Sequence, residues 1–274
     1  MSDEAVVQEF LQGPLTIKPA DFKFVRYAEE GAIVRLTLNR PEYNFLNERM
    51  LKELAYGIEG LHEKDDVKLI VIDSACKVFS GGVEVGEYTT QRVFQMLDAF
   101  HHVFIAMIDV GKPVMAVVNG PAIGGGSELA AFADLVIATP KARFAQPEIQ
   151  IGMFPPLAST IFPYIIGPRL ALEMVLTGEP IAAERAKELG LVSRLVAEKD
   201  LDKTVQDLTG KIASQSGAVL SMAKKAILGG MGMSLREGLK NSMNIFLNEL
   251  YRLEDSQEGL RALVEKRKPQ WKNR

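Results

Sequence analysis

Pro113-Val114-Met115-Ala116-Val117-Val118-Asn119-Gly120 is the stretch that decides the fold, because a continuous apolar run in it ends at a turn. A short apolar run closed by turn residues is typical of a strand that is buried on both faces. Strands of this kind belong to largely parallel sheets that are covered by helices. The stretch therefore predicts an internal strand of an α/β core, followed by the glycine triplet at residues 124–126.

The neighbouring segments alternate between strand and helix patterns. Asn47 is a good N-cap for a helix whose apolar residues recur every three or four positions as far as Leu61. A second helical stretch covers about residues 90–108. Apolar runs bounded by turns predict further strands at Ile33–Leu38, residues 67–72 and Leu135–Ala138. Strands that alternate with helices indicate an α/β fold with largely parallel pairing.

The chain changes character after Pro155-Pro156. From Leu157 onward helical periodicity dominates, interrupted by a short apolar segment at residues 191–196. Residues 201–268 have the pattern of successive amphipathic helices, and one of these helices carries an apolar stripe of Leu239, Met243, Phe246, Leu247 and Leu250. A stripe of this kind is more typical of a core or a subunit contact than of a cofactor site.

Composition limits the class of protein. With 274 residues and 47% hydrophobic content, the chain can bury one large core, or a core with a small appended domain. A formal charge of −3 argues against a nucleic-acid binder, and the single Cys76 excludes an internal disulfide framework. No apolar run reaches the roughly 18 residues of a membrane-spanning helix. Residues 1–13 contain no basic residue, unlike a signal or transit peptide, so we expect a soluble cytoplasmic protein.

Two glutamates stand in sequence that is too apolar for a solvated face. Glu128 follows the glycine triplet, and Glu148 lies in Phe144-Ala145-Gln146-Pro147-Glu148-Ile149. A carboxylate in such a setting needs a partner or a chemical role. If the two meet in one pocket, they can supply the acid and the base that add or remove water. The glycines before Glu128 leave backbone N–H groups open to a developing negative charge.

Simpler explanations of these residues stay open. The glycine triplet can be a tight strand-to-helix turn without function, and either glutamate can be a helix N-terminal charge or half of an ion pair. The triplet lacks the G-x-G-x-x-G and Gly-Lys-Ser/Thr spacings of nucleotide-binding loops. His62, His101 and His102 lack metal-ligand spacing, Cys76 has no histidine partner, and Ser127 lacks the G-x-S-x-G frame. We therefore expect no metal site and an inert thiol.

Taken together, the motifs of this chain resemble those of the enoyl-CoA hydratase/isomerase superfamily, also called the crotonase family. The matching stretches are Leu38-Asn39-Arg40-Pro41, Asn44-Phe45-Leu46-Asn47, Phe79-Ser80-Gly81-Gly82-Val83-Glu84, residues 112–120, residues 124–130, residues 142–148 and residues 258–267. They span nearly the whole chain beyond about the first twenty residues. The resemblance implies an α/β spiral of ββα units over residues 1–200, followed by a C-terminal helical trimerisation region over residues 201–274. It also implies trimers, often paired as hexamers.

The resemblance also implies roles for particular residues. The backbone N–H groups of Val83 and Gly125 would form an oxyanion hole for the thioester carbonyl of an acyl-CoA substrate. Glu128 would hold and deprotonate the attacking water, and Glu148 would deliver a proton to the α-carbon. No cofactor is implied, because CoA is part of the substrate and the N–H pair stabilises the enolate.

Other residues would bind the substrate. The nucleotide end of CoA would lie along Asn44, Phe45 and Leu46, while Gly82 and the loop at Glu84-Val85 would border the pantetheine. The basic residues of the tail 266–272 would approach the CoA phosphates of a neighbouring subunit, or else only oppose the dipole of a helix end.

One segment departs from the pattern of many hydratases. Met153-Phe154-Pro155-Pro156 stands where relatives have a glycine-rich loop, and Ser80-Gly81-Gly82-Val83-Glu84-Val85 replaces a more usual Ala-Gly-Ala-Asp. Both features look similar to the cyclic dienoyl-CoA hydratases, which hydrate cyclohexa-1,5-diene-1-carbonyl-CoA. We therefore expect Phe154 and Pro156 to shape the acyl pocket.

Two other functions stay open at this stage. An enoyl-CoA isomerase of the same fold needs only one glutamate to move a proton between carbons. A non-catalytic protein of this fold would instead bind RNA or a partner. The presence of both Glu128 and Glu148 favours a hydratase, and the acidic composition disfavours RNA binding.

Overall fold

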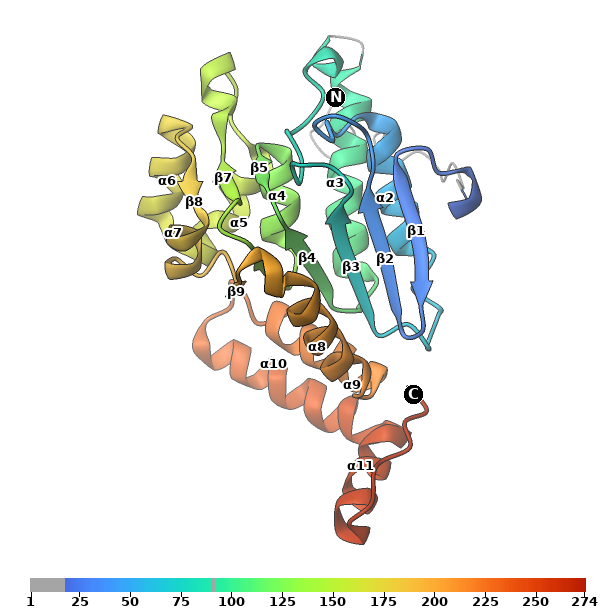
Figure 1. Ribbon diagram of the computed structural model, residues 1–274. Helices are drawn as coiled ribbons and strands as arrows, with labels where there is room; N and C mark the ends of the chain where they lie inside the picture. The colour runs from blue at the N-terminus through green and yellow to red at the C-terminus, as the bar shows by residue number, and fades with distance from the viewer. Residues whose placement is uncertain (1–17, 90–91) are drawn as a thin grey trace.

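The computed structural model describes residues 18–89 and 92–274, so the segment 1–13 and the predicted helix start at Thr90 lie outside the described residues. A six-stranded sheet forms the centre (Figure 1). Its strands, in spatial order, are β1 (Val25–Glu30), β2 (Ile33–Leu38), β3 (Leu69–Ser74), β4 (Val114–Val118), β6 (Leu135–Ala138) and β9 (Arg194–Leu195). Only the β1–β2 pair in this sheet is antiparallel. The predicted α/β fold with largely parallel pairing is confirmed.

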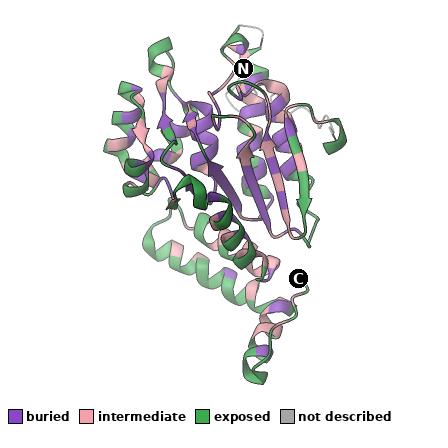
Figure 2. Ribbon diagram, in the orientation of Figure 1, coloured by how far each residue is buried: buried purple, intermediate pink, exposed green. Residues whose placement is uncertain are grey.

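Side chains on the two faces of the sheet pack against different helices. Ile70 and Ile72 of β3 belong to the main hydrophobic core with α2 (Glu48–Glu59) and α3 (Val93–Asp109). Leu69 and Val71 lie on the opposite face, with Leu201 and Val205 of α8 (Leu201–Ala213). Because successive side chains of a strand point to opposite faces, an apolar residue is required at every position. This explains the continuous apolar runs, and the buried strands are visible in Figure 2.

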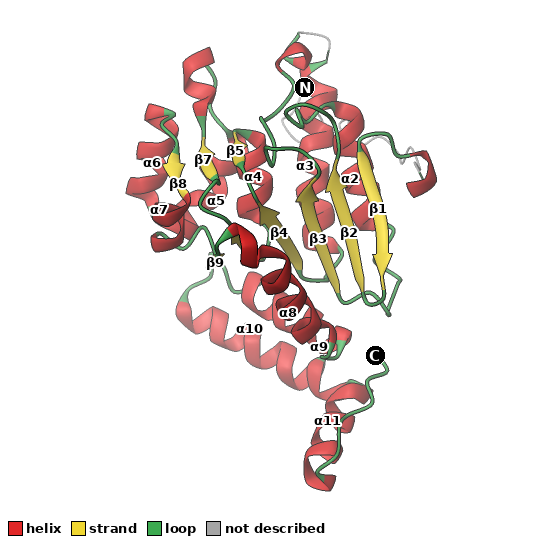
Figure 3. Ribbon diagram, viewed as in Figure 1, coloured by secondary structure: helices red, strands yellow, loops and turns green. Residues whose placement is uncertain are grey.

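A second, three-stranded sheet lies beside the first one. It consists of β5 (Pro121–Ile123), β7 (Arg143–Ala145) and β8 (Ile181–Ala182), in that order (Figure 3). β5 and β7 run parallel, and β8 is antiparallel to β7. The helix α4 (Gly125–Phe132) follows β5, and a short 3-10 helix, η3 (Pro147–Ile151), follows β7.

Helices make up most of the remaining chain. They are α5 (Pro156–Ile166), α6 (Pro168–Thr177), α7 (Ala183–Glu188), α9 (Gly217–Leu228), α10 (Leu235–Asn248) and α11 (Glu254–Glu265), with 3-10 turns η1 (Pro19–Asp21), η2 (Val85–Glu87), η4 (Glu198–Asp200) and η5 (Leu250–Arg252). The C-terminal helices α8 to α11 lie at one end of the molecule, and α10 and α11 are largely exposed (Figures 1 and 2). Within the described ranges, no helix is both long and apolar enough to cross a membrane.

Three predicted boundaries need correction. The strand predicted at residues 67–72 starts at Leu69 and continues to Ser74, because its polar end pairs with the end of β2, where Leu38 lies opposite Ser74. The helix predicted to pass through Leu250 ends at Asn248, since the backbone at Glu249 (φ −120°, ψ −67°) is not helical. The helix predicted over residues 90–108 is α3, whose described turns run from Val93 to Asp109. The predicted Asn47 cap is confirmed, with its side chain accepting from the N–H of Met50 at 3.0 Å.

Candidate active site

The small sheet brings the two glutamate-bearing segments together. Ile123 at the end of β5 is opposite Ala145 at the end of β7. The N–H of Gly124 then donates to the carbonyl of Ala145 at 2.8 Å. Because the strands are parallel, the segments that follow them leave the sheet at the same edge. Glu128 lies in the first turn of α4 and Glu148 in η3, so both carboxylates come from this edge.

The Glu128 carboxylate is buried between two helix N-termini. Glu128 is only 2% exposed. One carboxylate oxygen, Oε1, accepts the N–H of Ala158 in the first turn of α5 at 2.6 Å. Burial raises the pKa of Glu128 to about 8, the Ala158 hydrogen bond opposes this rise, and the charge of Glu148 adds to it. The two carboxylates are therefore near enough to interact electrostatically.

Glu148 is held against the glycine turn. A Cβ atom on Gly124, which has φ +51°, would lie 2.4 Å from Oε1 of Glu148. Only a glycine at position 124 therefore lets this carboxylate reach the backbone of the turn. The other oxygen, Oε2, is buried and has no hydrogen-bond partner in the part of the chain that the structure describes. Burial raises the pKa of Glu148 as well.

Two backbone N–H groups lie beside the glycine turn. Leu46 and Val83 form a parallel bridge, in which the N–H of Leu46 donates to Gly82 and the N–H of Glu84 donates to Leu46. This pattern leaves the N–H of Val83 outside the pairing. Gly125 is the first residue of α4, so its N–H has no partner within the helix. A Cβ on Gly125 would lie 2.8 Å from Cγ2 of Val83, which means that the two residues are in contact.

Two acidic side chains and two backbone N–H groups without a hydrogen-bond partner among the described residues thus lie close together at the glycine turn. The family model for enoyl-CoA hydratase/isomerase matches residues 28–274. The chain belongs to the enoyl-CoA hydratase/isomerase family. This membership confirms the family prediction and the prediction that the protein is a hydratase-type enzyme.

Individual relatives and solved structures agree with this assignment. A probable mitochondrial enoyl-CoA hydratase of Dictyostelium discoideum is 34% identical over 252 residues, which cover 90% of each chain. A cyclohexa-1,5-dienecarbonyl-CoA hydratase of Thauera aromatica is 29% identical over 245 residues, covering 89% of this chain and 95% of that protein. A crystal structure of an enoyl-CoA hydratase subunit from Geobacillus kaustophilus has a TM-score of 0.85 at 31% identity, covering 92% and 99% of the chains. The likeness confirms the predicted crotonase-type fold.

Tyr88 is a residue of the site that the sequence did not reveal. It follows η2, a few residues after Val83, and packs half-buried against the main core. Burial raises the pKa of its phenol, and the charges of Glu148 and Glu128 raise it further. The phenol therefore lies within electrostatic range of both carboxylates. A lone tyrosine after a loop carries no pattern in the sequence, so only the fold identifies it.

The segment expected to border the nucleotide end of CoA is partly internal. The side chains of Asn44 and Leu46 are fully buried. The Asn44 amide accepts the N–H of Arg40 at 2.7 Å and donates to Ser74 and Phe79 at 2.8 and 3.1 Å. The Asn44 side chain therefore fixes the conformation of the loop. A CoA molecule could contact this segment only through its backbone and through the half-buried side chain of Phe45.

The residues expected near the pantetheine lie around the bridge to Leu46. Gly82 is buried with φ +99°, and its carbonyl is used in that bridge. Glu84 forms an ion pair with Arg40 at 2.7 Å, and the same guanidinium donates to the Phe45 carbonyl at 2.7 Å. Glu84 thus holds the loop that carries the N–H of Val83 in place.

The residues predicted to shape the acyl pocket lie at the start of α5, and their role there stays a prediction. Phe154 is 65% exposed and Pro156 is also exposed, whereas Pro155 between them is buried. The segment contacts the Glu128 carboxylate a little further along the chain, at Ala158. Pro155 caps α5 and Pro156 is its first residue, so both prolines set the start of this helix. The rigid element beside the carboxylate is therefore the N-terminal turn of α5.

The basic tail is tied to its own subunit at several points. Arg267 donates to both oxygens of Glu258, and Lys272 pairs with Glu254 at 2.9 Å. The backbone N–H groups of Lys272 and Asn273 donate to the buried Asp255 at 2.7 and 2.9 Å. An approach of this tail to CoA phosphates stays a prediction.

The remaining candidates of the sequence have local contacts. Burial raises the pKa of the Cys76 thiol, which keeps it protonated at neutral pH, as expected for an inert thiol. A ring nitrogen of His62 lies 3.1 Å from the Asp109 carbonyl, and His102 pairs with Glu59 at 2.5 Å. Among residues 18–89 and 92–274, no group of three or more His, Cys, Asp or Glu side chains is arranged to hold a metal ion.

Proposed function

We propose that the protein catalyses the reversible addition of water to the double bond of an α,β-unsaturated acyl-CoA thioester. We propose further that it prefers a cyclic, conjugated acyl group such as cyclohexa-1,5-diene-1-carbonyl. The observation that carries the first part is that the buried Glu128 and the partly buried Glu148 lie within electrostatic range of each other, at a glycine turn beside the N–H groups of Val83 and Gly125. The second part rests on the rigid start of α5 and on the relative from Thauera aromatica.

The N–H pair suits the charge that develops in this reaction. When an oxygen nucleophile adds to the β-carbon, electrons move through the α-carbon onto the thioester oxygen, which becomes enolate-like. Preorganised donors aimed at such an oxygen usually contribute the largest single catalytic term. The donors belong to the backbone at Val83 and Gly125, so the side chain at position 83 is free to vary.

The two carboxyls suit the proton transfers. Glu128 takes a proton from water as the water oxygen bonds to the β-carbon, and Glu148 gives a proton to the α-carbon, so the net change is the addition of one water. The backbone at Leu157 and Ala158, whose N–H donates to Oε1 of Glu128, holds this carboxyl in place. Burial raises the pKa of both carboxyls, and their repulsion disfavours two charges in one site. With the pKa of Glu128 at about 8, the pair holds one proton at neutral pH in the unliganded protein, and the roles proposed here require that proton to lie on Glu148 when the thioester is bound.

The second carboxyl favours hydration over isomerisation. An isomerase needs one group to move a proton between two carbons, whereas hydration needs a base for the water and an acid for the carbon. A second buried carboxyl without such a role would cost stability, because burial of an unpaired charge is unfavourable. This supports a hydratase.

The start of α5 supports a flat acyl group. Pro155 and Pro156 fix the backbone just before Leu157 and Ala158, which adjoin Glu128. A rigid wall cannot adapt to a long, mobile acyl chain, but it suits a ring, which loses little conformational entropy on binding. An apolar wall discriminates between substrates by only about 1–3 kcal/mol of transition-state binding free energy for a methylene-sized mismatch. Linear substrates should therefore still react slowly.

The decisive experiment compares two substrates under the same conditions. We expect kcat/KM for cyclohexa-1,5-diene-1-carbonyl-CoA to exceed that for crotonyl-CoA by about tenfold or more. Equal or higher efficiency on crotonyl-CoA would reject the cyclic preference and leave a general enoyl-CoA hydratase. Failure to hydrate either thioester, with both bound, would reject the hydratase itself.

A further inference from the structure

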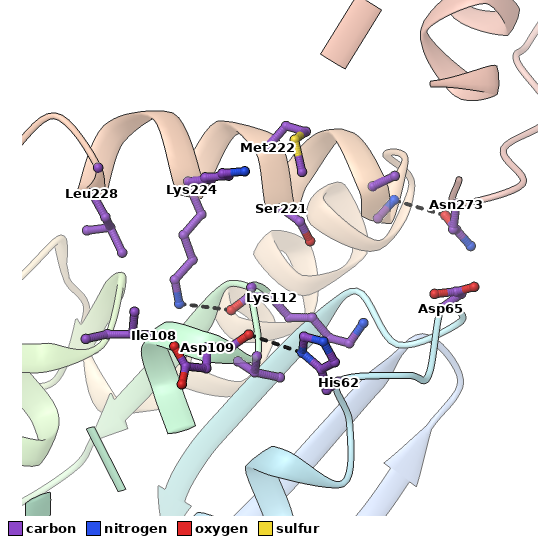
Figure 4. Close-up of a pocket in the computed structure, with 16 residues that line it drawn as sticks. His62, Asp65, Ile108, Asp109, Lys112, Ser221, Met222, Lys224, Leu228 and Asn273 are labelled. Carbon is purple, nitrogen blue, oxygen red and sulfur yellow. Dashed lines mark hydrogen bonds between the residues drawn. The ribbon is translucent and has the colours of Figure 1, made fainter. Parts of the chain in front are cut away.

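A cavity lies away from the carboxylate pair. It has a volume of about 620 Å³ and lies between α9, the loop after α2 and the turn that joins α3 to β4 (Figure 4). Its lining includes Lys112, which precedes the amino end of β4, whereas Gly125 and Glu128 follow the carboxyl end of that strand. None of the residues of the carboxylate site lines it. The cavity is therefore at the opposite edge of the sheet.

Lys112 brings an unpaired positive charge to the wall of this cavity. The residue is only 7% exposed, and among the described residues its ammonium makes no hydrogen bond or ion pair. Figure 4 shows its side chain running along the cavity floor toward His62 and Asp65. Burial lowers the pKa of Lys112, and the Asp65 carboxylate opposes this effect through its charge. The ammonium itself opens onto the cavity, so an anion that enters can reach it and accept a charge-assisted hydrogen bond.

The neighbouring lysines of the cavity are already satisfied. The ammonium of Lys224 contacts Asp134 at 2.8 Å and the carbonyls of Met107 and Lys112 at 2.8 and 3.0 Å. The ammonium of Lys225 is paired with Glu249. Lys112 is therefore the cation of this cavity that can accept a new partner.

The rest of the lining sets the chemistry of that partner. Ile108, Val110, Met222 and Leu228 give the cavity an apolar part, and Ser221 of α9 points into it (Figure 4). The lining contains no arginine, which disfavours two-pronged recognition of a phosphate, and no Phe, Tyr or Trp for stacking a base. Asp65 and Asp109 of the lining repel anions in proportion to their charge, so a single negative charge is tolerated better than two or three.

We propose that this cavity binds a small amphiphilic monocarboxylate, with its carboxylate on the Lys112 ammonium and its hydrocarbon chain against Val110, Met222 and Leu228. The volume lies within the range of roughly 300–1,000 Å³ that is usual for small-molecule sites. A chain of about eight carbons combines one charge with enough apolar surface to use both parts of the lining. The site is separate from the proposed catalytic centre and does not depend on that proposal.

Calorimetric titration of the full chain with octanoate tests this site. Acetoacetyl-CoA is present at saturation, so that its acyl group occupies the catalytic centre. We expect one saturable octanoate site, and we expect Lys112→Met to weaken it about tenfold or more, because hydrogen bonds to charged groups are among the stronger ones. Lys225→Met is the matched control: Lys225 lines the same cavity but is already paired, so its loss should change the affinity by no more than about twofold.

Two further titrations test the apolar part of the cavity and the need for a charge on the ligand. Met222→Trp fills the apolar part without touching the charge and should also abolish octanoate binding, which covers the case of a Lys112→Met protein that does not fold. Octan-1-ol, the uncharged analogue, should bind weakly and equally to the wild type and to Lys112→Met. The proposal is overturned if octanoate shows no saturable binding, if both variants bind like the wild type, or if inorganic phosphate binds more tightly than octanoate.

Discussion

Ile123 and Ala145 are paired in parallel register, and this pairing aligns the two chain segments that carry the catalytic candidates. The hydrogen bond from Gly124 to Ala145 continues the pairing by one more residue. Beyond this hydrogen bond, the segment after β5 forms α4 and the segment after β7 forms η3. Glu128 and Glu148 therefore lie at the same edge of the sheet. A sheet of very short strands therefore has a specific use in this protein: it sets the relative position of two carboxyls that are twenty residues apart in the sequence.

Replacement of either glutamate by glutamine should abolish most hydration. Glu128→Gln and Glu148→Gln keep the size of each side chain but remove its ability to exchange a proton. We expect each to lower kcat by about 10²–10⁴-fold, the usual contribution of a positioned acid or base. Loss of the enoyl absorbance at saturating thioester measures the rate, and thioester binding by calorimetry serves as the control. Near wild-type turnover of either variant would show that the two-glutamate mechanism is wrong.

The sequence predicted those parts of the fold that depend on local pattern. The apolar run of β4, the Asn47 cap and the settings of Glu128 and Glu148 are each visible within a few residues. The strand β1 was missed, because most of it is exposed and it lacks a continuous apolar run. The strands β5, β7 and β8 were missed because they have three, three and two residues, too few to establish a period.

Contacts between distant segments could not be predicted in the same way. The Ala158 N–H that holds Glu128 lies thirty positions further along the chain, and only the packing of α5 on α4 brings it there. The sequence likewise does not show that Phe154 is exposed while its neighbour Pro155 is buried, because this also depends on how the start of α5 packs. Tyr88 likewise has no motif of its own. Residue identity indicated which groups matter, and the fold determines which of them meet.

The apolar face of α10 should mediate assembly. Met243, Phe246 and Leu247 are 56%, 49% and 54% exposed in the single chain, as an unpartnered interface would be. We expect sedimentation at micromolar concentration to show three or six chains. Leu247→Glu should shift the protein toward the monomer, because a charge at a buried contact is unfavourable. Lys240→Glu, on the same helix but without an apolar side chain, is the control. A monomeric wild type would contradict the expectation.

Stability should depend on pH through Glu128. Burial raises its pKa in the folded protein to about 8, from an ordinary value of 4.5. The folded state therefore binds more protons than the unfolded state between these values, so the free energy of unfolding falls as the pH rises through this window. Glu128→Gln removes this dependence and should become more stable than the wild type near pH 8, by a few kcal/mol at most. Urea unfolding at pH 5 and pH 8 checks this, and an equal fall in both proteins would contradict it.

The glycine turn gives the sharpest test of the site geometry. Gly124→Ala places a Cβ only 2.4 Å from Oε1 of Glu148. This is closer than the two atoms can approach, so the carboxylate must move. We expect kcat for hydration to fall by about tenfold or more, because misplacement of a catalytic group by about 1 Å can be this costly. Gly152→Ala is the matched control: Gly152 also has a positive φ (+76°), but a Cβ there meets nothing within 4 Å. Its backbone (φ 76°, ψ 24°) is left-handed helical and less restrictive than that of Gly124 (φ 51°, ψ −127°), so this variant tests the effect of a positive φ without a clash and should leave kcat nearly unchanged. Equal losses of activity in both variants would assign the effect to strain and not to the position of Glu148.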